Sequence, residues 1–299
     1  MSQRKCYICI LITGCLWGLI GTFVKLLENA GSTSVYTAFL RMFFGSILLL
    51  FFCIAKEGAR ALRIHRRTLL SCLAIAVFSQ GIYNLAYNSA ISMIGVSYSA
   101  ILYNSAPLFT ALFSVLLFKE SIGRRKLIGI LANVAGCILT ILGGSMTGGN
   151  TGGNTVLIGI IYALITALGY AICPILGKLS DSRDSSLAMA TYCAVFTWIF
   201  LLLFRPLGGV SEPFNFRLIS IGFAYALCTT GVADILWYTG IKNIKDSSKV
   251  PVLASSNLLV ATLLGTMLFK EKYGLLSIAG VALVMLSIWI INGKDRDNV

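Results

Sequence analysis

Long apolar stretches separated by short polar breaks run along the whole chain. Ten of these stretches have about the 20 residues that an α-helix needs to cross the hydrocarbon core of a bilayer. The pattern therefore predicts an all-α integral membrane protein with ten transmembrane helices. They are expected at Cys6–Leu27, Val35–Ala55, Thr68–Ala90, Val96–Leu117, Lys126–Gly144, Val156–Gly177, Ser186–Phe204, Leu218–Ile241, Ser247–Leu268 and Gly274–Asn292.

The chain also repeats itself without a gap. The run Phe118-Lys119-Glu120 recurs as Phe269-Lys270-Glu271, and a shorter match at a nearly equal offset pairs Trp17 with Tyr170. Duplication on this scale in an apolar chain is typical of secondary transporters. We predict a first five-helix repeat over residues 1–144, a Gly-rich linker over 145–155 and a second repeat over 156–299. Because five is odd, the second repeat is expected to be inverted relative to the first.

The composition and the distribution of charge agree with a membrane protein. Charged residues make up 12% of the chain, against about 25% in a soluble domain. The net charge of +13 does not indicate nucleic-acid binding, because the basic residues lie in the short breaks between apolar stretches. With the N-terminus in the cytoplasm, most of the 24 Lys and Arg residues fall on the inner side, in accord with the positive-inside rule. We therefore expect a multi-pass protein with both termini cytoplasmic.

Enzyme and cofactor signatures are missing from the sequence. There is no Gly-x-x-x-x-Gly-Lys-Ser/Thr run for binding ATP, and no His, Cys and carboxylate cluster suits a metal. The nine cysteines lie mostly in apolar stretches, so no disulfide is predicted, and His65, set among arginines, is expected to be solvated. We expect a protein that is not an enzyme and binds no cofactor. Its expected partners are the lipid bilayer and a small-molecule substrate, with the chain as a monomer or homodimer.

Several short motifs resemble those of the EamA family in the drug/metabolite transporter superfamily. They are Leu16-Trp17-Gly18 with Lys25, Arg41 in the second helix, Tyr87-Asn88-Ser89-Ala90, Pro107-Leu108-Phe109 and Phe118-Lys119-Glu120. The resemblance covers nearly the whole chain, and ten helices in an inverted duplication are themselves a trait of that family. It implies export or exchange of amino acids and related small metabolites across the bacterial inner membrane. The second half departs from the pattern, since Leu258 stands where the first half has Pro107.

A stripe of polar residues marks the third predicted helix. Gln80, Tyr83, Asn84 and Tyr87 share one helical face, and polar groups in lipid need internal partners or a wet cavity. The stripe is read as the lining of a substrate cavity, and the alternative is hydrogen bonding between helices. For Asn104 in the fourth helix, and for Ser256 and Asn257 in the ninth, cavity and hydrogen-bonding roles are equally open. Trp17 is either a cavity wall or a packing residue.

Two ionisable residues lie within predicted helices. Arg41 stands about 10 Å from the outer end of its helix, a depth from which an arginine can still extend to the membrane surface. Asp234 lies at a comparable depth from the inner end of the eighth helix, and its short side chain extends poorly. Carboxylates inside membranes commonly mark ion or proton paths, so Asp234 is the candidate for proton coupling. The different depths argue against a simple ion pair between the two residues.

These observations favour a secondary transporter that exports or exchanges small amino-acid-like metabolites by alternating access. One alternative is an exporter of cationic lipophilic drugs. Another is a membrane scaffold or lipid-handling protein with no aqueous substrate path. The residues proposed to bind substrate are Trp17, Arg41, Gln80, Tyr83, Asn84, Tyr87, Asn104, Asp234 and Ser256.

Overall fold

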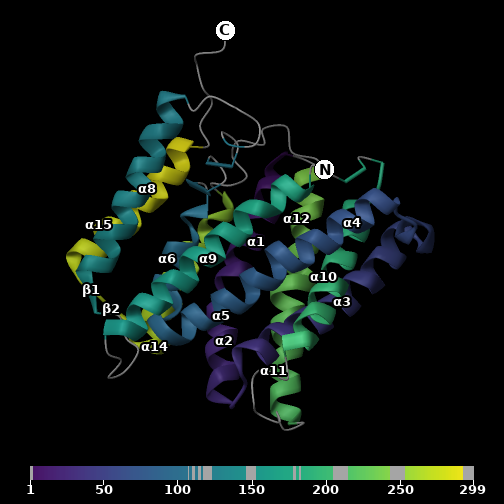
Figure 1. Cartoon of the computed structure of the whole chain (residues 1–299), viewed down its shortest axis with the longest axis horizontal. Coiled ribbons are helices and arrows are strands. Elements are labelled where there is room, and N and C mark those ends of the chain that lie inside the picture. The colour runs from purple at the N-terminus through teal and green to yellow at the C-terminus, as the bar shows by residue number, and fades with distance from the viewer. Residues whose placement is uncertain are drawn as a thin grey trace.

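The computed structural model is almost entirely helical (Figure 1), which confirms the all-α class. It describes residues 3–106, 108–109, 112–113, 116, 123–145, 153–177, 180–181, 183–204, 215–242 and 253–291. The loop that holds Lys119 and Glu120 lies outside the described residues, as do most of the linker and the first residues of the predicted helix Ser247–Leu268.

The helices of the first half begin and end close to the predicted positions where the structure describes them. The first predicted helix is divided at Leu19 into two segments that continue as one rod. In chain order the elements are α1 (Gln3–Gly18), α2 (Ile20–Asn29), α3 (Ser34–Glu57), a 3₁₀ turn η1 (Ala59–Leu62), α4 (Arg66–Ala74), α5 (Ile82–Ile94), α6 (Val96–Tyr103) and α8 (Arg124–Gly143).

In the described part of the second half, the helices are α9 (Gly153–Gly177), α10 (Ser186–Phe204), α11 (Phe216–Ala226), α12 (Ala233–Lys242), α14 (Ser256–Phe269) and α15 (Leu275–Ile291). Across the described residues, six helical rods are long and apolar enough to cross a membrane, and three further apolar helices are shorter. The long rods are Gln3–Asn29, Ser34–Glu57, Arg66–Ile94, Asn154–Cys173, Ser186–Leu203 and Phe216–Trp237. The chain is therefore a multi-pass membrane protein.

Two of the long rods contain a more loosely wound π-helical segment. One segment, η2 (Ile75–Gly81), joins α4 to α5, and the other, η4 (Leu227–Val232), joins α11 to α12. At the offset that superposes Phe118 on Phe269, Gly81 falls on Val232, so the two segments end at matching positions of the sequence repeat. Short π segments inside α-helices are frequent at functional sites.

Helices α8 and α15 pack side by side and run in opposite directions (Figure 1). Arg125 Nε, at the start of α8, donates a hydrogen bond of 3.0 Å to the carbonyl oxygen of Ile290, at the end of α15. Beyond their other ends, β1 (Gly144–Ser145) pairs antiparallel with β2 (Lys272–Tyr273). The two backbones approach closely at Gly136 and Gly280, because neither residue has a side chain. A Cβ added to Gly136 would lie only 2.8 Å from the carbonyl oxygen of Gly280. We call the end of the molecule at which β1 and β2 meet the β-end.

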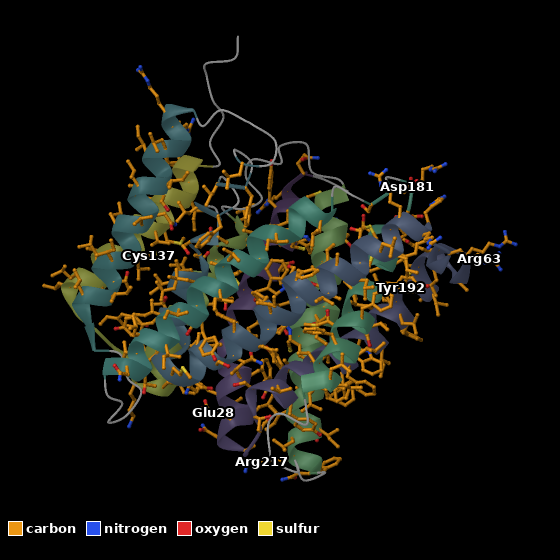
Figure 2. All side chains as sticks on the ribbon, in the orientation of Figure 1. Glu28, Arg63, Cys137, Asp181, Tyr192 and Arg217 are labelled. Carbon is orange, nitrogen blue, oxygen red and sulfur yellow. The ribbon has the colours of Figure 1, made fainter. Side chains whose placement is uncertain are left out.

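Charged side chains gather at the two ends of the helix bundle, as Figure 2 shows for Arg63 and Asp181 at one end and for Glu28 and Arg217 at the other. Large apolar side chains such as Phe51 cover the outside between these ends. This arrangement suits a bilayer, in which lipid contacts the apolar belt and water contacts the charged ends.

Candidate functional site

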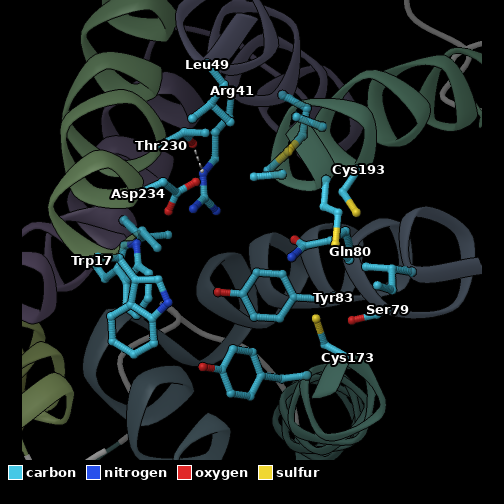
Figure 3. Close-up of a pocket in the computed structure, with 18 of the residues that line it drawn as sticks. Trp17, Arg41, Leu49, Ser79, Gln80, Tyr83, Cys173, Cys193, Thr230 and Asp234 are labelled. Atoms are coloured by element: carbon cyan, nitrogen blue, oxygen red, sulfur yellow. Dashed lines mark hydrogen bonds between the residues drawn. The ribbon is translucent and has the colours of Figure 1, made fainter. Parts of the chain in front are cut away.

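A cavity of about 490 Å³ lies inside the helix bundle and is lined by residues from both halves (Figure 3). Both π segments reach it, η2 through Ser79 and η4 through Thr230. Cavities of this size hold small metabolites. The lining extends to Ser180 and Ser186, between the end of α9 and the start of α10, so the cavity reaches toward the end of the molecule that holds Asp181.

The structure brings together most of the residues that the sequence singled out. Asn84, Asn104 and Ser256 do not belong to the cavity lining, and their side chains bond to other protein groups. The remaining residues of the proposed set all line the cavity, namely Trp17, Arg41, Gln80, Tyr83, Tyr87 and Asp234.

Arg41 is the buried cation of this site, with 7% of its surface exposed. Its Nε donates to Thr230 Oγ1 at 3.3 Å, and its Nη1 donates to Asn84 Oδ1 at 3.2 Å. The guanidinium carbon also lies 5.3 Å from the ring centroid of Tyr225, a cation–π distance. Figure 3 shows the guanidinium pointing into the cavity. The arginine is thus fixed by both halves of the chain while its end faces the open space.

Asn84 supports Arg41 from behind. Its Nδ2 donates to the carbonyl oxygen of Gln80 at 2.7 Å, and only 1% of the residue is exposed. The carbonyl of Gln80 lies within η2, where π winding changes the usual backbone pairing. Asn84 therefore joins the irregular backbone to the arginine, and it contributes to the site by positioning Arg41.

Asp234 faces Arg41 from the second half. It lies in the first turn of α12, one helical turn after Thr230, and its carboxylate lines the cavity. Figure 3 shows the carboxylate and the guanidinium directed into the same space. The ion pairs among the described residues do not include one between Arg41 and Asp234. One cavity thus presents a cation and a carboxylate that do not neutralise each other by direct contact.

Four tyrosines form one wall of the cavity. The Tyr83 and Tyr87 rings are stacked with centroids 5.7 Å apart, and Tyr103 meets Tyr170 edge-on at 5.2 Å. Tyr83 joins the two pairs, because its ring lies 5.7 Å from that of Tyr103 and 6.2 Å from that of Tyr170. We call these four residues the tyrosine wall. Such a wall offers apolar faces together with hydroxyl groups.

A pair of tryptophans, Trp17 and Trp237, also lines the cavity, with ring centroids 5.0 Å apart. Asn257 also lines the cavity, and its Oδ1 is buried without a hydrogen-bond partner in the described residues. An unpaired buried acceptor is costly, and a ligand that donates a hydrogen bond would satisfy it.

Asn104 and Ser256 take part in hydrogen bonds within the protein and do not line the cavity. Asn104 Nδ2 donates to the carbonyl oxygen of Ala100 at 2.7 Å, and its own carbonyl oxygen accepts from Asn133 Nδ2 at 3.3 Å. Ser256 Oγ donates to the carbonyl oxygen of Leu11 at 3.2 Å, at the contact between α14 and α1. The Ser256 side chain thus has the hydrogen-bonding role between helices that the sequence left open, whereas the Asn104 side chain bonds its own helix.

Sequence reasoning missed Tyr103 and Thr230, which line the cavity. The sequence repeat contained a signal for Thr230, because the offset that superposes Phe118 on Phe269 also places Ser79 on Thr230, and both line the cavity. Asn257, for which the sequence left cavity and hydrogen-bonding roles open, lines the cavity, and its unpaired acceptor is seen only in the structure.

A polar contact joins the two halves outside the membrane-spanning helices, at the end opposite the β-end. His65 Nδ1 lies 2.8 Å from Asp184 Oδ1, and Thr68 Oγ1 also donates to the Asp184 carboxylate. Burial acts to raise the pKa of Asp184, but the hydrogen bonds from Thr68 and His65 outweigh it and hold this pKa below its ordinary value. His65 was expected to be solvated, and this was wrong in part, because the half-exposed ring also bonds the second half.

Comparison with known proteins shows that this chain is similar to transporters. An uncharacterized transporter of Archaeoglobus fulgidus is 27% identical over 282 residues, which cover 94% of each chain. YetK, an uncharacterized transporter of Bacillus subtilis, is 27% identical over 84% of this chain and 75% of its own. A solved crystal structure of a protein has the same fold, with a TM-score of 0.69 at 17% identity, and covers 97% of this chain and 96% of that one. The sequence profile of the EamA-like transporter family matches the chain twice, over residues 4–142 and 157–293, and the chain therefore belongs to this family of membrane transporters.

Proposed function

We propose that the chain is a secondary active transporter that exports or exchanges small amino-acid-like metabolites across the bacterial inner membrane by alternating access. The substrate carries both an amino group and a carboxylate and is held in the cavity described above. The observation that carries this proposal is the presence of Arg41 and Asp234, opposite in charge and unpaired with each other, in one buried cavity.

The chemistry of the two charged residues matches the two ends of such a substrate. The planar guanidinium of Arg41 is fixed through Nε and Nη1, which leaves its outer edge to meet a carboxylate. The Asp234 carboxylate accepts hydrogen bonds from an ammonium group, and Asn257 Oδ1 is a second acceptor for the same group. Charges inside a membrane are costly, so a zwitterion that satisfies both is bound in preference to a neutral solute.

The aromatic residues supply the contact for the rest of the substrate. The tyrosine wall and the pair Trp17 and Trp237 give flat apolar surfaces on which a side chain can pack. The fully lipophilic cation of the alternative drug-export function would satisfy Asp234 and the rings but offer no anionic group to the guanidinium of Arg41.

Alternating access follows from the proposed architecture of ten helices in two inverted five-helix repeats, over residues 1–144 and 156–299. Supporting observations are the two matches of the family profile, the corresponding π segments, and the opposite directions of α8 and α15, which correspond in the repeat. Inverted repeats of this kind open a central site first to one side and then to the other. The basic residues favour cytoplasmic N- and C-termini.

Asp234 is the residue that we assign to proton coupling. Burial in a cavity disfavours the charged form of a carboxylate, and a substrate ammonium favours it. Proton and substrate would therefore compete for this carboxylate and exchange places as the site faces each side in turn.

Counterflow in proteoliposomes tests the proposal. The purified chain is reconstituted and loaded in turn with amino acids, nucleosides and cationic dyes, and uptake of the labelled compound is measured. Counterflow of at least one amino acid, lost in Arg41→Gln, is the expected result. Counterflow of dyes alone would support drug export, and no counterflow of any compound would favour the scaffold or lipid-handling function.

A further inference from the structure

A buried carboxylate at the β-end ties the second half of the chain to the first. Glu271 directly precedes β2, yet only 3% of its surface is exposed. Its Oε1 accepts a hydrogen bond from the backbone nitrogen of Val96 at 2.6 Å, and its Oε2 accepts one from Ser97 at 3.1 Å. The Tyr273 hydroxyl donates to the same Oε2 at 3.2 Å. Glu271 therefore caps the first two amides of α6 across the interface between the halves.

The residues on both sides of this contact allow the Glu271 carboxylate to approach the start of α6. Lys270 ends α14 in the left-handed conformation, with φ of 54°, and this turn directs the next residue toward α6. On the other side, Gly95 precedes α6 with φ of 91°, and a Cβ there would collide with the Glu271 carboxylate. The unpaired amides and positive dipole end of a helix N-terminus stabilise an anion in this position. The second Phe-Lys-Glu run thus forms a joint between the two halves.

Helix α6 connects this joint to the cavity. The helix begins at Val96, which Glu271 holds, and ends at Tyr103, which belongs to the tyrosine wall. Its eight residues span about 12 Å at 1.5 Å per residue. A short helix of this kind moves as a unit, so release of its N-terminus also displaces Tyr103 relative to Tyr83 and Tyr170.

We propose that Glu271 is the latch that closes the cavity at the β-end and that it releases α6 when the cavity opens to that side. The proposal rests on the alternating access in the proposed function. In this conformation the cavity lining extends to Ser180 and Ser186, toward the opposite end, while Glu271 joins the halves at the β-end. A cavity that is closed at the β-end and extends toward the opposite end is expected when the latch is engaged in one of the two access states.

The side from which the cavity is reached can be measured through Cys173, which lines it. Vesicles of both orientations are treated with a membrane-impermeant thiol reagent, and modification of Cys173 is followed by peptide mass spectrometry. Glu271→Gln is nearly isosteric but removes the negative charge and one acceptor. It is expected to raise the ratio of labelling from the β-end to labelling from the opposite end on the order of tenfold. The matched control is Glu28→Gln, which removes a half-exposed carboxylate whose partner is Lys25, and its ratio should stay at the parent value.

Two results would overturn the latch. One is an unchanged labelling ratio in Glu271→Gln, and the other is a parallel rise in labelling from both sides, which a purely structural role would produce. If Glu271→Gln fails to fold, Tyr273→Phe removes a single hydrogen bond to the same carboxylate, and a smaller shift of about threefold in the same direction is expected. An unchanged ratio in that variant also rejects the proposal. If Glu271→Gln shows the labelling shift while the parent protein gives no counterflow of amino acids, the substrate assignment is rejected and the latch stands.

Discussion

Replacing Arg41 with lysine separates the shape of the cation from its charge. The guanidinium holds Thr230 and Asn84 through two different nitrogens and still presents an edge to the cavity. A lysine ammonium keeps the charge but cannot reach both partners and offer a two-pronged contact to a carboxylate at the same time. Arg41→Lys is therefore expected to weaken substrate binding while the protein still inserts into the membrane.

The magnitude follows from the hydrogen bonds that change. A hydrogen bond to a charged group contributes about 1.5–3 kcal/mol, and lysine gives up one of the two bonds that an arginine makes to a carboxylate. Substrate affinity should therefore fall about 10- to 100-fold. Leaving Asn84 Oδ1 or Thr230 Oγ1 unpaired in a buried site costs about 1–3 kcal/mol more, and this cost appears in the stability of the free protein.

Substrate-induced stabilisation of the purified protein against heat measures this affinity, with a competent amino acid from the counterflow panel as ligand. Arg217→Lys is the matched control, because it makes the same chemical change at an exposed position at the start of α11. The control should retain the parent affinity. Parent-like affinity in Arg41→Lys would refute the assignment of the guanidinium to the substrate carboxylate.

Other residues give further predictions. Asp234→Asn should abolish accumulation driven by a proton gradient and spare some substrate exchange, because exchange needs no net proton movement; gradient-driven uptake equal to the parent's would end the coupling role. Tyr87→Leu should lower transport several-fold with normal membrane insertion. Asn84→Leu should lower both transport and the melting temperature, because it removes the acceptor for Arg41 Nη1. Since the pKa of Asp184 is lowered in the folded protein, its stabilising contribution is present above about pH 3.9 and is lost as pH falls through the lowered pKa. The melting temperatures of the parent and Asp184→Asn should accordingly differ at neutral pH and converge in acid.

The helical class and most of the cavity could be predicted because both rest on local patterns. Membrane-length apolar stretches require helices, since lipid cannot pair with backbone groups. Polar residues spaced one helical turn apart, such as Gln80, Tyr83 and Tyr87, share a face and must point inward. The costs of a charge in lipid likewise singled out Arg41 and Asp234.

The roles of individual polar residues depended on long-range contacts that spacing does not encode. Asn104 and Tyr103 are neighbours in the chain, but only Tyr103 faces the cavity, because successive helical residues point about 100° apart. Asn84 belongs to the same polar stripe as Tyr83, yet it does not line the cavity and instead accepts a hydrogen bond from Arg41 of another helix. Whether a polar residue lines the cavity or bonds another helix depends on which helices pack against its own.

The π segments and the buried Glu271 were also beyond sequence reasoning. Apolar side chains fit π and α winding alike, so the periodicity of residues 75–81 and 227–232 carried no sign of the change. Glu271 lies in a charged break that reads as a solvent-exposed loop, and its partners are at Val96 and Ser97 in the other half. The repeat showed only that the Phe-Lys-Glu run occurs in both halves, and it did not indicate that Glu271 is buried.

The proposed cavity binds both charged ends of an amino-acid-like substrate. This can be tested by comparing three compounds in counterflow: a transported amino acid, the same molecule without its carboxylate, and the same molecule without its amino group. We expect only the complete amino acid to be exchanged at the parent rate, because loss of the carboxylate removes the anion that meets Arg41 and loss of the amino group removes the cation that meets Asp234. Equal exchange of the amine that lacks a carboxylate would contradict this expectation.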